Sequence, residues 1–271
     1  MEVFEGSGKG QARGARRGIA VQGAAAFSKY MAVLQAVADE PGRLDRAGLA
    51  RQMPYPRGTV YRLVSALEAE NLLNEHADGT LHLGHRLISL ASRSWENSDL
   101  RSTAHDHLEE LRRLTGETVH LAVPSGLGMV YIDKLESPHT VRMTSRIGTY
   151  VDLHTTSVGK AYLAALSPDA RAALVQRIEF RPRTSNSITD APTLLQEVER
   201  VAQQGYSEDR EEQEPEIRCF GAAILDRDGA PVGCVSVSVP TFRFDAQTAK
   251  AQIGHLKRAV ARISAEYATL V

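Results

Sequence analysis

The sequence predicts an α+β chain of two domains, a small helical domain in front and a larger domain built on an antiparallel sheet. The 271 residues are 42% hydrophobic and 24% charged, a globular composition with a length that suits two domains. Apolar residues recur at helical spacing before Gly116 and alternate as in strands after it. Residues 1–95 carry 12 Lys and Arg against 9 Asp and Glu, whereas residues 96–271 carry 20 against 24, so only the front is net positive.

Residues 1–23 are rich in glycine and arginine and contain no apolar stretch, so we expect a disordered basic tail rather than a signal peptide. No apolar run approaches the roughly 20 residues that a membrane-spanning helix needs. The two cysteines, Cys219 and Cys234, form neither a Cys-x-x-Cys pair nor a disulfide framework. These features predict a cytoplasmic protein without a membrane partner.

Residues 24–84 predict a domain with the order helix, helix, turn, helix and hairpin. Apolar residues at helical spacing indicate a first helix over 27–38, and a second, short helix follows over 45–52. The third helix begins near Pro56, a residue well suited to a first helical turn. The pair Asp78-Gly79 between two short strand-like runs is typical of a tight hairpin.

Residues 85–98 predict a linker helix, and residues 99–271 a second domain that begins with a helix up to about residue 114. Further strands are expected over 118–123, 129–132, 140–145, 150–153, 218–225 and 232–239, and further helices over 157–165, 168–178, 192–204 and 246–268. Antiparallel strands with helices to one side make an α+β domain of the kind that holds small molecules.

The front domain has the pattern of a winged helix-turn-helix. Two helices joined by a tight turn can place the second one in the major groove of DNA, and the hairpin then serves as the wing. Between positions 43 and 62 five arginines face one acid, Asp45, and arginine donates well to phosphate oxygens and guanine edges. The residues that we expect to contact DNA lie on the outer faces of these two helices: Arg46, Arg51, Arg57, Gly58, Thr59, Tyr61, Arg62 and Ser65.

Other functions are open to the same residues. A three-helix unit with a hairpin also serves as a protein-interaction module without specific DNA binding, although the arginine excess favours DNA. Ser125, His120, His154 and Asp133 could be combined into a Ser-His-Asp catalytic set. The sequence contains no Gly-x-Ser-x-Gly elbow, however, which argues against a serine hydrolase of that type. The histidine pairs have no Cys or His partners at zinc-ligand spacing. We therefore expect no enzyme, no metal site and no cofactor.

Four loose motifs in one order, between Phe27 and Tyr267, carry a resemblance to a known family. They are Thr59-Val60-Tyr61-Arg62-Leu63-Val64, Asp78-Gly79 with Leu81-His82-Leu83-Gly84, Leu153-His154-Thr155-Thr156-Ser157-Val158-Gly159-Lys160-Ala161, and Gly205-Tyr206-Ser207 with Ile217-Arg218-Cys219. Together they resemble the IclR family, the isocitrate lyase regulator type of bacterial transcription regulator. The resemblance implies a winged helix, a connecting helix and a GAF-like effector domain. It also implies homodimers or homotetramers on palindromic operator DNA and a small organic effector, often a carboxylate or an aromatic metabolite.

Carried over position by position, the resemblance implies an effector pocket lined by Thr140, Met143, Val151, Ser157, Val158, Asp209, Ile217, Cys219, Ser236 and Ser238. The sequence departs from the family pattern at four places. Pro54 replaces the usual glycine of the turn. Gly58 stands where a serine often contacts DNA, Asp152 stands where proline precedes the Leu-His pair, and Glu216 replaces a glycine.

The chemistry of these positions suits a compact acid. The expected helix at Ser157 would offer free N–H groups and a positive dipole end to an anion. Ser236 and Ser238 are two apart on one strand and so share a face, with Cys219 on a neighbouring strand. The alternatives are serines bonded to the backbone, a cysteine that is only a small core residue, and, at Lys160, a solvated or structural lysine. The sequence thus predicts a repressor or activator whose operator affinity is set by a small organic effector.

Overall fold

The computed structural model describes residues 24–96 and 99–270 of the chain. The basic tail expected at residues 1–23 lies outside the described residues, as do residues 97–98 at the end of the expected linker helix. The chain divides after Glu96 into two compact units. No described helix is both long enough and apolar enough to cross a membrane.

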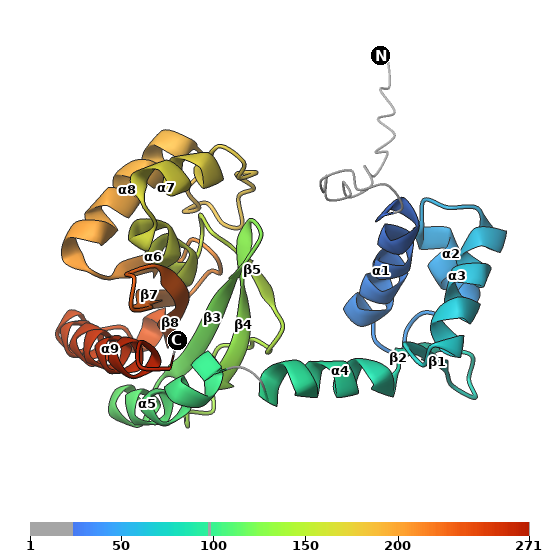
Figure 1. The fold of residues 1–271 in the computed structure, drawn as a ribbon, viewed down its shortest axis with the longest axis horizontal. Coiled ribbons are helices and arrows are strands. Elements are labelled where there is room, and N and C mark those ends of the chain that lie inside the picture. The colour runs from blue at the N-terminus through green and yellow to red at the C-terminus, as the bar shows by residue number, and fades with distance from the viewer. Residues whose placement is uncertain (1–23, 97–98, 271) are drawn as a thin grey trace, which may run out of the picture. The chain divides into compact units, whose positions relative to one another are not determined.

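The front unit has the order helix, helix, turn, helix and hairpin, followed by one more helix (Figure 1). Asp45 begins the second helix as its N-cap, because its carboxylate accepts a hydrogen bond of 2.6 Å from the Gly48 amide. Met53 ends the same helix in an extended conformation, as the residue before a proline usually does. The elements are α1 (Ala24–Asp39), α2 (Arg46–Gln52), α3 (Arg57–Ala69), β1 (Leu73–Glu75), β2 (Leu81–Leu83) and α4 (His85–Glu96).

One hydrophobic core holds the front unit together. Val60, Val64 and Leu67 recur at helical spacing along one side of α3 and are buried against Val33 and Val37 of α1. Burial of each such side chain contributes about 1.5–3 kcal/mol relative to exposure. The opposite side of α3 therefore remains at the surface of the unit.

The back unit is built on a six-stranded antiparallel sheet with the strand order β5-β4-β3-β8-β7-β6. Its strands are β3 (Thr118–Ser125), β4 (Gly128–Leu135), β5 (Tyr150–Asp152), β6 (Ser207–Arg210), β7 (Ile217–Leu225) and β8 (Pro231–Pro240). Its helices are α5 (Asp99–Thr115), α6 (Ser157–Ala165), α7 (Pro168–Val175), α8 (Ala191–Gln204) and α9 (Ala246–Tyr267), with a short 3₁₀ turn at Thr241–Arg243. The predicted α+β class is confirmed.

Helices cover both faces of the sheet, not one side as expected from the sequence (Figure 1). Val119 and Leu121 of β3 and Val237 of β8 face α5 and α9 in a largely apolar layer. The buried Asp133 of β4 is a polar member of that layer, and its Oδ2 lies 3.2 Å from His105 Nδ1 of α5. The other face packs against α6, α7 and α8 through Ala122 and Cys234, and it also carries the polar side chains of the central strands. Alternation along the strands thus separates a mainly apolar face from a mixed one.

Two strand assignments differ from the expectation. Residues 140–145 form no strand. Two of their carbonyls accept from side chains instead: Arg243 Nη1 donates to the Val141 oxygen and Lys134 Nζ to the Ser145 oxygen, at 2.9 and 2.8 Å. In turn, Ser207–Arg210 forms the edge strand β6, which the sequence did not predict. Four polar residues carry no apolar alternation, so their strand depends on pairing with β7.

Candidate functional site

The outer side of α3 presents exposed arginines. Arg57 donates from Nε and Nη2 to the Tyr61 hydroxyl at 3.0 and 2.7 Å, and its guanidinium lies 5.1 Å from the centre of that ring. Arg62 is exposed and makes no ion pair within the described residues. Thr59 is half-buried beside them, and Gly58 has open space where a side chain would stand. The helix therefore offers two guanidiniums and a hydroxyl to an outside acceptor.

The guanidinium of Arg46 on α2 binds side chains of the same unit. Its Nε lies 2.6 Å from Glu75 Oε2, its Nη2 lies 2.7 Å from Glu68 Oε2, and its Nη1 donates to Ser65 Oγ at 3.1 Å. The hydrogen bond to Glu75 raises the pKa of Arg46 further. This arginine clamps α2 to α3 and β1, whereas Arg51 in the last turn of α2 is exposed.

The hairpin of β1 and β2 is short and held by its turn. Gly79 adopts a positive φ of 82°, which a residue with a side chain rarely does. Asp78 Oδ1 accepts from the Thr80 amide at 2.9 Å and from the Thr80 hydroxyl, and these bonds lower the pKa of Asp78. The rings of His76 and His82 stack 3.7 Å apart on the hairpin.

In the back unit the sheet register joins several predicted pocket residues into one row. Asp209 of β6 pairs with Cys219 of β7, which pairs with Ser238 of β8. All three side chains are buried, and Cys219 Sγ donates to Ser238 Oγ at 3.2 Å. Burial raises the pKa of the Cys219 thiol, so the sulfur stays protonated. We name Asp209, Cys219 and Ser238 the polar row.

Helix α6 begins directly above the sheet beside the polar row. Thr156 caps it by accepting from the Gly159 amide at 3.1 Å. A Cβ on Gly221 of β7 would lie 2.7 Å from the Ser157 backbone, so the helix start rests on that glycine. Ser207 Oγ of β6 fixes the same turn by donating to the Ser157 oxygen at 2.6 Å. This seat brings the first N–H groups of α6, at Ser157 and Val158, over the mixed face of the sheet.

Asp209 is the charged group of the row, and its environment disfavours the charge. Burial raises the pKa of Asp209 to about 7, and the neighbouring Glu212 carboxylate adds to that rise. The Glu212 amide opposes it by donating to Asp209 Oδ1 at 2.7 Å. Near neutral pH the carboxyl is therefore divided between its neutral and anionic forms.

Lys160 of α6 is fully buried rather than solvated. Its Nζ lies 2.6 Å from Glu212 Oε1 and 3.8 Å from Glu197 Oε1 of α8. Because Glu212 also binds Asp209 through its amide, this lysine links α6, α8 and the loop after β6. Its role in the fold is structural, and such a pair is costly to break by removal of one partner.

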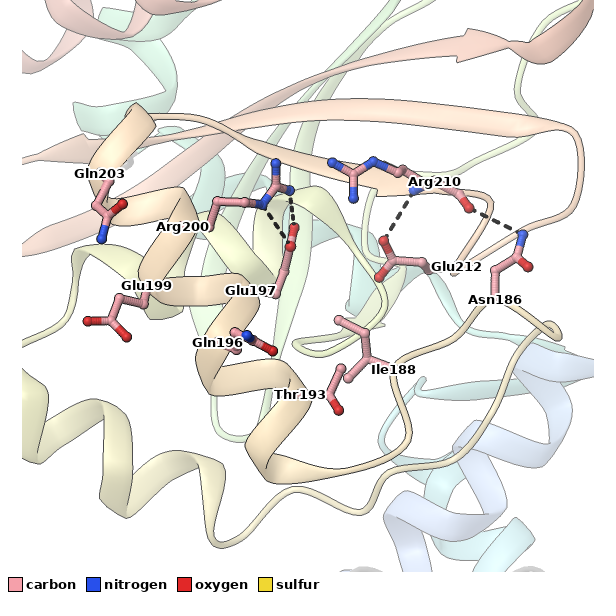
Figure 2. A pocket seen from close by; sticks show the side chains of 10 residues that line it. All are labelled: Asn186, Ile188, Thr193, Gln196, Glu197, Glu199, Arg200, Gln203, Arg210 and Glu212. Carbon is pink, nitrogen blue, oxygen red and sulfur yellow. Dashed lines mark hydrogen bonds and ion pairs between the residues drawn. The ribbon is translucent and has the colours of Figure 1, made fainter.

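A cavity of about 830 Å³ lies between α8 and the loop after β6 (Figure 2). Glu212 forms the wall shared with the Lys160 pair, and its Oε2 has no hydrogen-bond partner within the described residues. Figure 2 shows Arg200 bound to Glu197 on one side of the cavity and Arg210 on the other. The lining is Asn186, Ile188, Thr193, Gln196, Glu197, Glu199, Arg200, Gln203, Arg210 and Glu212, none of which is a predicted pocket residue.

The other predicted pocket residues are spread around the row. Ser236 is buried two residues before Ser238, and Val151 on β5 belongs to the apolar cluster under α6. Ile217 begins β7 and is half-buried. Thr140 is exposed and Met143 half-buried in the irregular segment after β4, and no described contact joins them to the row.

Two aromatic residues of the mixed face were not predicted from the sequence. His120 of β3 pairs with Ser236 in register and stacks on Tyr131 of β4, with ring centres 4.4 Å apart. His120 Nε2 lies 2.6 Å from Ser145 Oγ in the segment after β4. The available signal was a histidine at an inward position of an otherwise apolar strand, two residues after Thr118.

A winged helix with exposed arginines, carried on one chain with a domain that buries a polar row beside a helix start, defines a DNA-binding transcription regulator that responds to a small molecule. The family model described as bacterial transcriptional regulator IclR C-terminal matches residues 93–265, and the IclR helix-turn-helix domain model matches residues 27–76. The chain belongs to the IclR family.

Individual relatives agree with this assignment. The HTH-type transcriptional regulator KdgR of Escherichia coli (strain K12) is 32% identical over 239 residues, which cover 88% of this chain and 90% of that protein. The HTH-type transcriptional repressor AllR of the same strain is 29% identical over 245 residues, 90% of each chain. The crystal structure of the Thermotoga maritima IclR has a TM-score of 0.72 at 31% identity, covering 90% of this chain and 99% of that one. The protein is a transcription regulator and not an enzyme, and the interaction-module alternative is not supported.

Proposed function

We propose that this regulator is a repressor that binds operator DNA through the outer side of α3 and releases it when a small organic acid binds beside the polar row. The exposed Arg57 and Arg62 carry the first part of this proposal, because neither is neutralised by an internal acid in the described residues. Relatives that are named repressors support the direction of control. Operator DNA as the partner sets the bacterial cytoplasm as the place of action.

The proposed DNA-contacting residues remain those predicted: Arg46, Arg51, Arg57, Gly58, Thr59, Tyr61, Arg62 and Ser65. Within this set the structure favours a direct contact for Arg62 and Arg57. Arg46 and Ser65 bind each other and the two acids of the clamp, so their contribution is to hold α2 against α3. A homodimer on a palindromic operator would place two such helices about one helical turn, 34–36 Å, apart.

The effector site is proposed to lie between the start of α6 and the mixed face of the sheet. Orphan N–H groups at a helix start favour a carboxylate, and the neutral form of Asp209 can donate a hydrogen bond to one. The residues proposed to line it are Thr140, Met143, Val151, Ser157, Val158, Asp209, Ile217, Cys219, Ser236 and Ser238. Exchange of Ser236 and Ser238 together for alanine should weaken binding of a carboxylate effector in calorimetry and leave operator binding unchanged.

The DNA-binding half of the proposal is tested with Arg62→Ala, measured by fluorescence anisotropy on the upstream region of the protein's own gene. If Arg62 neutralises a phosphate, the variant binds more weakly and its log Kd depends less steeply on log salt, by about one unit per chain. Arg227→Ala, which removes an exposed arginine from the β7–β8 turn of the other unit, is the matched control and should change neither quantity. An unchanged salt slope in Arg62→Ala removes this residue from the contacts.

A further inference from the structure

His120 carries a buried polar atom that the protein does not satisfy. The side chain is fully buried on the mixed face of the sheet. Nε2 lies 2.6 Å from Ser145 Oγ, whereas Nδ1 has no hydrogen-bond partner within the described residues. Buried polar atoms without a partner are uncommon in native proteins, and one explanation is an absent ligand.

The position of His120 relates this atom to the proposed effector site. His120 pairs in register with Ser236, and Ser236 pairs with Gly221, on which the start of α6 rests. Strands β3 and β7 are thus two spacings apart, about 10 Å, with β8 between them. The Tyr131 ring bridges part of that span, because it stacks on His120 and its hydroxyl lies close enough to Cys219 and Asp209 for them to raise its pKa, in addition to burial.

The charge state of His120 defines what Nδ1 can bind. Burial and the nearby Lys134 lower the pKa of His120 to about 3, so the imidazole is neutral at physiological pH. In a neutral imidazole one nitrogen donates and the other accepts. Whichever role Nε2 takes toward Ser145, Nδ1 has the opposite one. A hydroxyl group both donates and accepts, so it satisfies either tautomer, whereas a carboxylate satisfies only one of them.

We propose that His120 is a specificity-determining residue of the effector site and that the effector is a hydroxy acid whose hydroxyl group hydrogen-bonds to His120 Nδ1. The acid's carboxylate occupies the proposed anion position at the start of α6 beside the polar row. The inference rests on the proposed effector site and adds to it a second recognition point, several bonds away from the carboxylate. An acid of the same length without the hydroxyl leaves Nδ1 unpaired and binds more weakly.

The test compares matched acids that differ only in the terminal hydroxyl. Glycolate, 3-hydroxypropionate and 4-hydroxybutyrate are titrated calorimetrically into the full-length protein beside acetate, propionate and butyrate. We expect at least one hydroxy acid to bind about 10- to 100-fold more tightly than its parent acid. The series of lengths reports the spacing between the carboxylate and His120.

Three variants assign the preference to one atom. His120→Phe keeps a flat ring on Tyr131 but removes both nitrogens, and it should reduce the hydroxyl preference to about twofold or less. Ser145→Ala removes the Nε2 partner and should leave most of the preference. His120→Gln supplies a donor and an acceptor again and should restore part of it. Thermal melts establish that each variant is folded before it is titrated.

The outcomes separate this inference from the proposed function. A preference that is lost in His120→Phe and kept in Ser145→Ala supports it. Equal binding of hydroxy and parent acids, or a preference that survives in His120→Phe, overturns the role of His120 while the anion site stands. Absence of binding by all six acids overturns the anion site and this inference together, and leaves the DNA-binding role intact. A His120→Phe chain that does not fold leaves the decision to His120→Gln, in which a reduced but not abolished preference without loss of parent-acid binding is the supporting result, and an undiminished preference overturns the role of His120.

Discussion

Asp209 is an acid placed where its charge is costly. Burial is the main cause of its pKa of about 7, and the groups that face it are Glu212, Lys160, Cys219 and the Tyr131 hydroxyl. Only the Lys160 ammonium among them is cationic, and it is already bound to Glu212. A second anion, such as an effector carboxylate, would raise the pKa of Asp209 further and would bind best to the protonated form.

We predict that Asp209→Asn makes the protein more stable at pH 8 and removes one component of its pH dependence. The folded-state pKa lies above the ordinary value of 3.8, so the native state binds more protons than the unfolded state between about pH 4 and pH 7. The free energy of unfolding of the wild type therefore falls as pH rises through that window, by up to about 1.4 kcal/mol per pH unit. Urea denaturation of both proteins at several pH values measures the difference.

Asp228→Asn, in the exposed β7–β8 turn, provides the control for this comparison, since its carboxylate is at the surface. A stability difference between wild type and Asp209→Asn that stays constant from pH 4 to pH 8 would contradict the raised pKa. The same titration with a carboxylate effector present should show tighter binding at pH 6 than at pH 8.

At the residue scale, local sequence patterns predicted which side chains share a face of a strand, but not which residues far apart in the chain form ion pairs. Ser236 and Ser238 share a face as strand alternation requires, and that inference needs only local geometry. Arg46 forms its ion pairs with Glu68 and Glu75, which are 22 and 29 positions away in the sequence, and no local pattern predicts these contacts. The burial of Lys160 has the same origin, because Glu212 is 52 positions away in the chain.

At the scale of elements, helix α6 depends on glycine at two of its contacts. A Cβ on Gly221 would approach the Ser157 backbone to 2.7 Å, and a Cβ on Gly159 would approach the Leu153 backbone to 2.5 Å. Distances this short require backbone to move, since no flexible side-chain end can turn away. The close packing of α6 against β7 and Leu153 therefore requires glycine at positions 221 and 159.

Gly221→Ala is expected to lower the free energy of unfolding by about 1–3 kcal/mol, because the added methyl forces α6 away from β7. Gly58→Ala provides an opposite outcome from the same chemical change. Gly58 lies in the first turn of α3, and a Cβ added there would meet nothing within 4 Å, so alanine should stabilise by about 0.4–1 kcal/mol through a less flexible unfolded chain. Thermal and urea unfolding measure both. Equal effects of the two substitutions would mean that α6 is not seated as tightly as the structure indicates.

Elements with a strong hydrophobic period were predictable, and elements that depend on pairing were not. The predicted helix at 246–268 differs from α9 by a single residue at its end, because its apolar stripe and its Asp245 cap are both local signals. Strand β6 has neither, and it exists as a strand because β7 supplies its partners. The segment at 140–145 has the composition of a strand but is not part of the sheet, and it is β5 that pairs with β4.

For the whole molecule, the expected behaviour is a coupling between two binding events on separate units. A hydroxy acid that binds the back unit should change the operator Kd by about 5- to 150-fold, equivalent to about 1–3 kcal/mol. By linkage, saturating operator DNA should change the acid's Kd by the same factor. Anisotropy titrations with and without the acid, and calorimetry with and without the operator, measure the two factors independently.

The double variant Ser236→Ala with Ser238→Ala is the control for this coupling, because it should bind the operator as the wild type does and respond less to the acid. An acid that binds the wild type but leaves its operator isotherm unmoved contradicts the coupling model for that acid. Two unequal factors would indicate that a third process, such as a change in assembly, accompanies one of the titrations.

The division of the chain after Glu96 has a consequence for how such regulators diversify. Because each unit has its own core and no described element of one completes the core of the other, a crossover at this point joins two intact parts. Recombination at this point can join an existing effector domain to a DNA-binding domain with a different operator specificity. It can equally join an existing DNA-binding domain to an effector domain that binds a different small molecule.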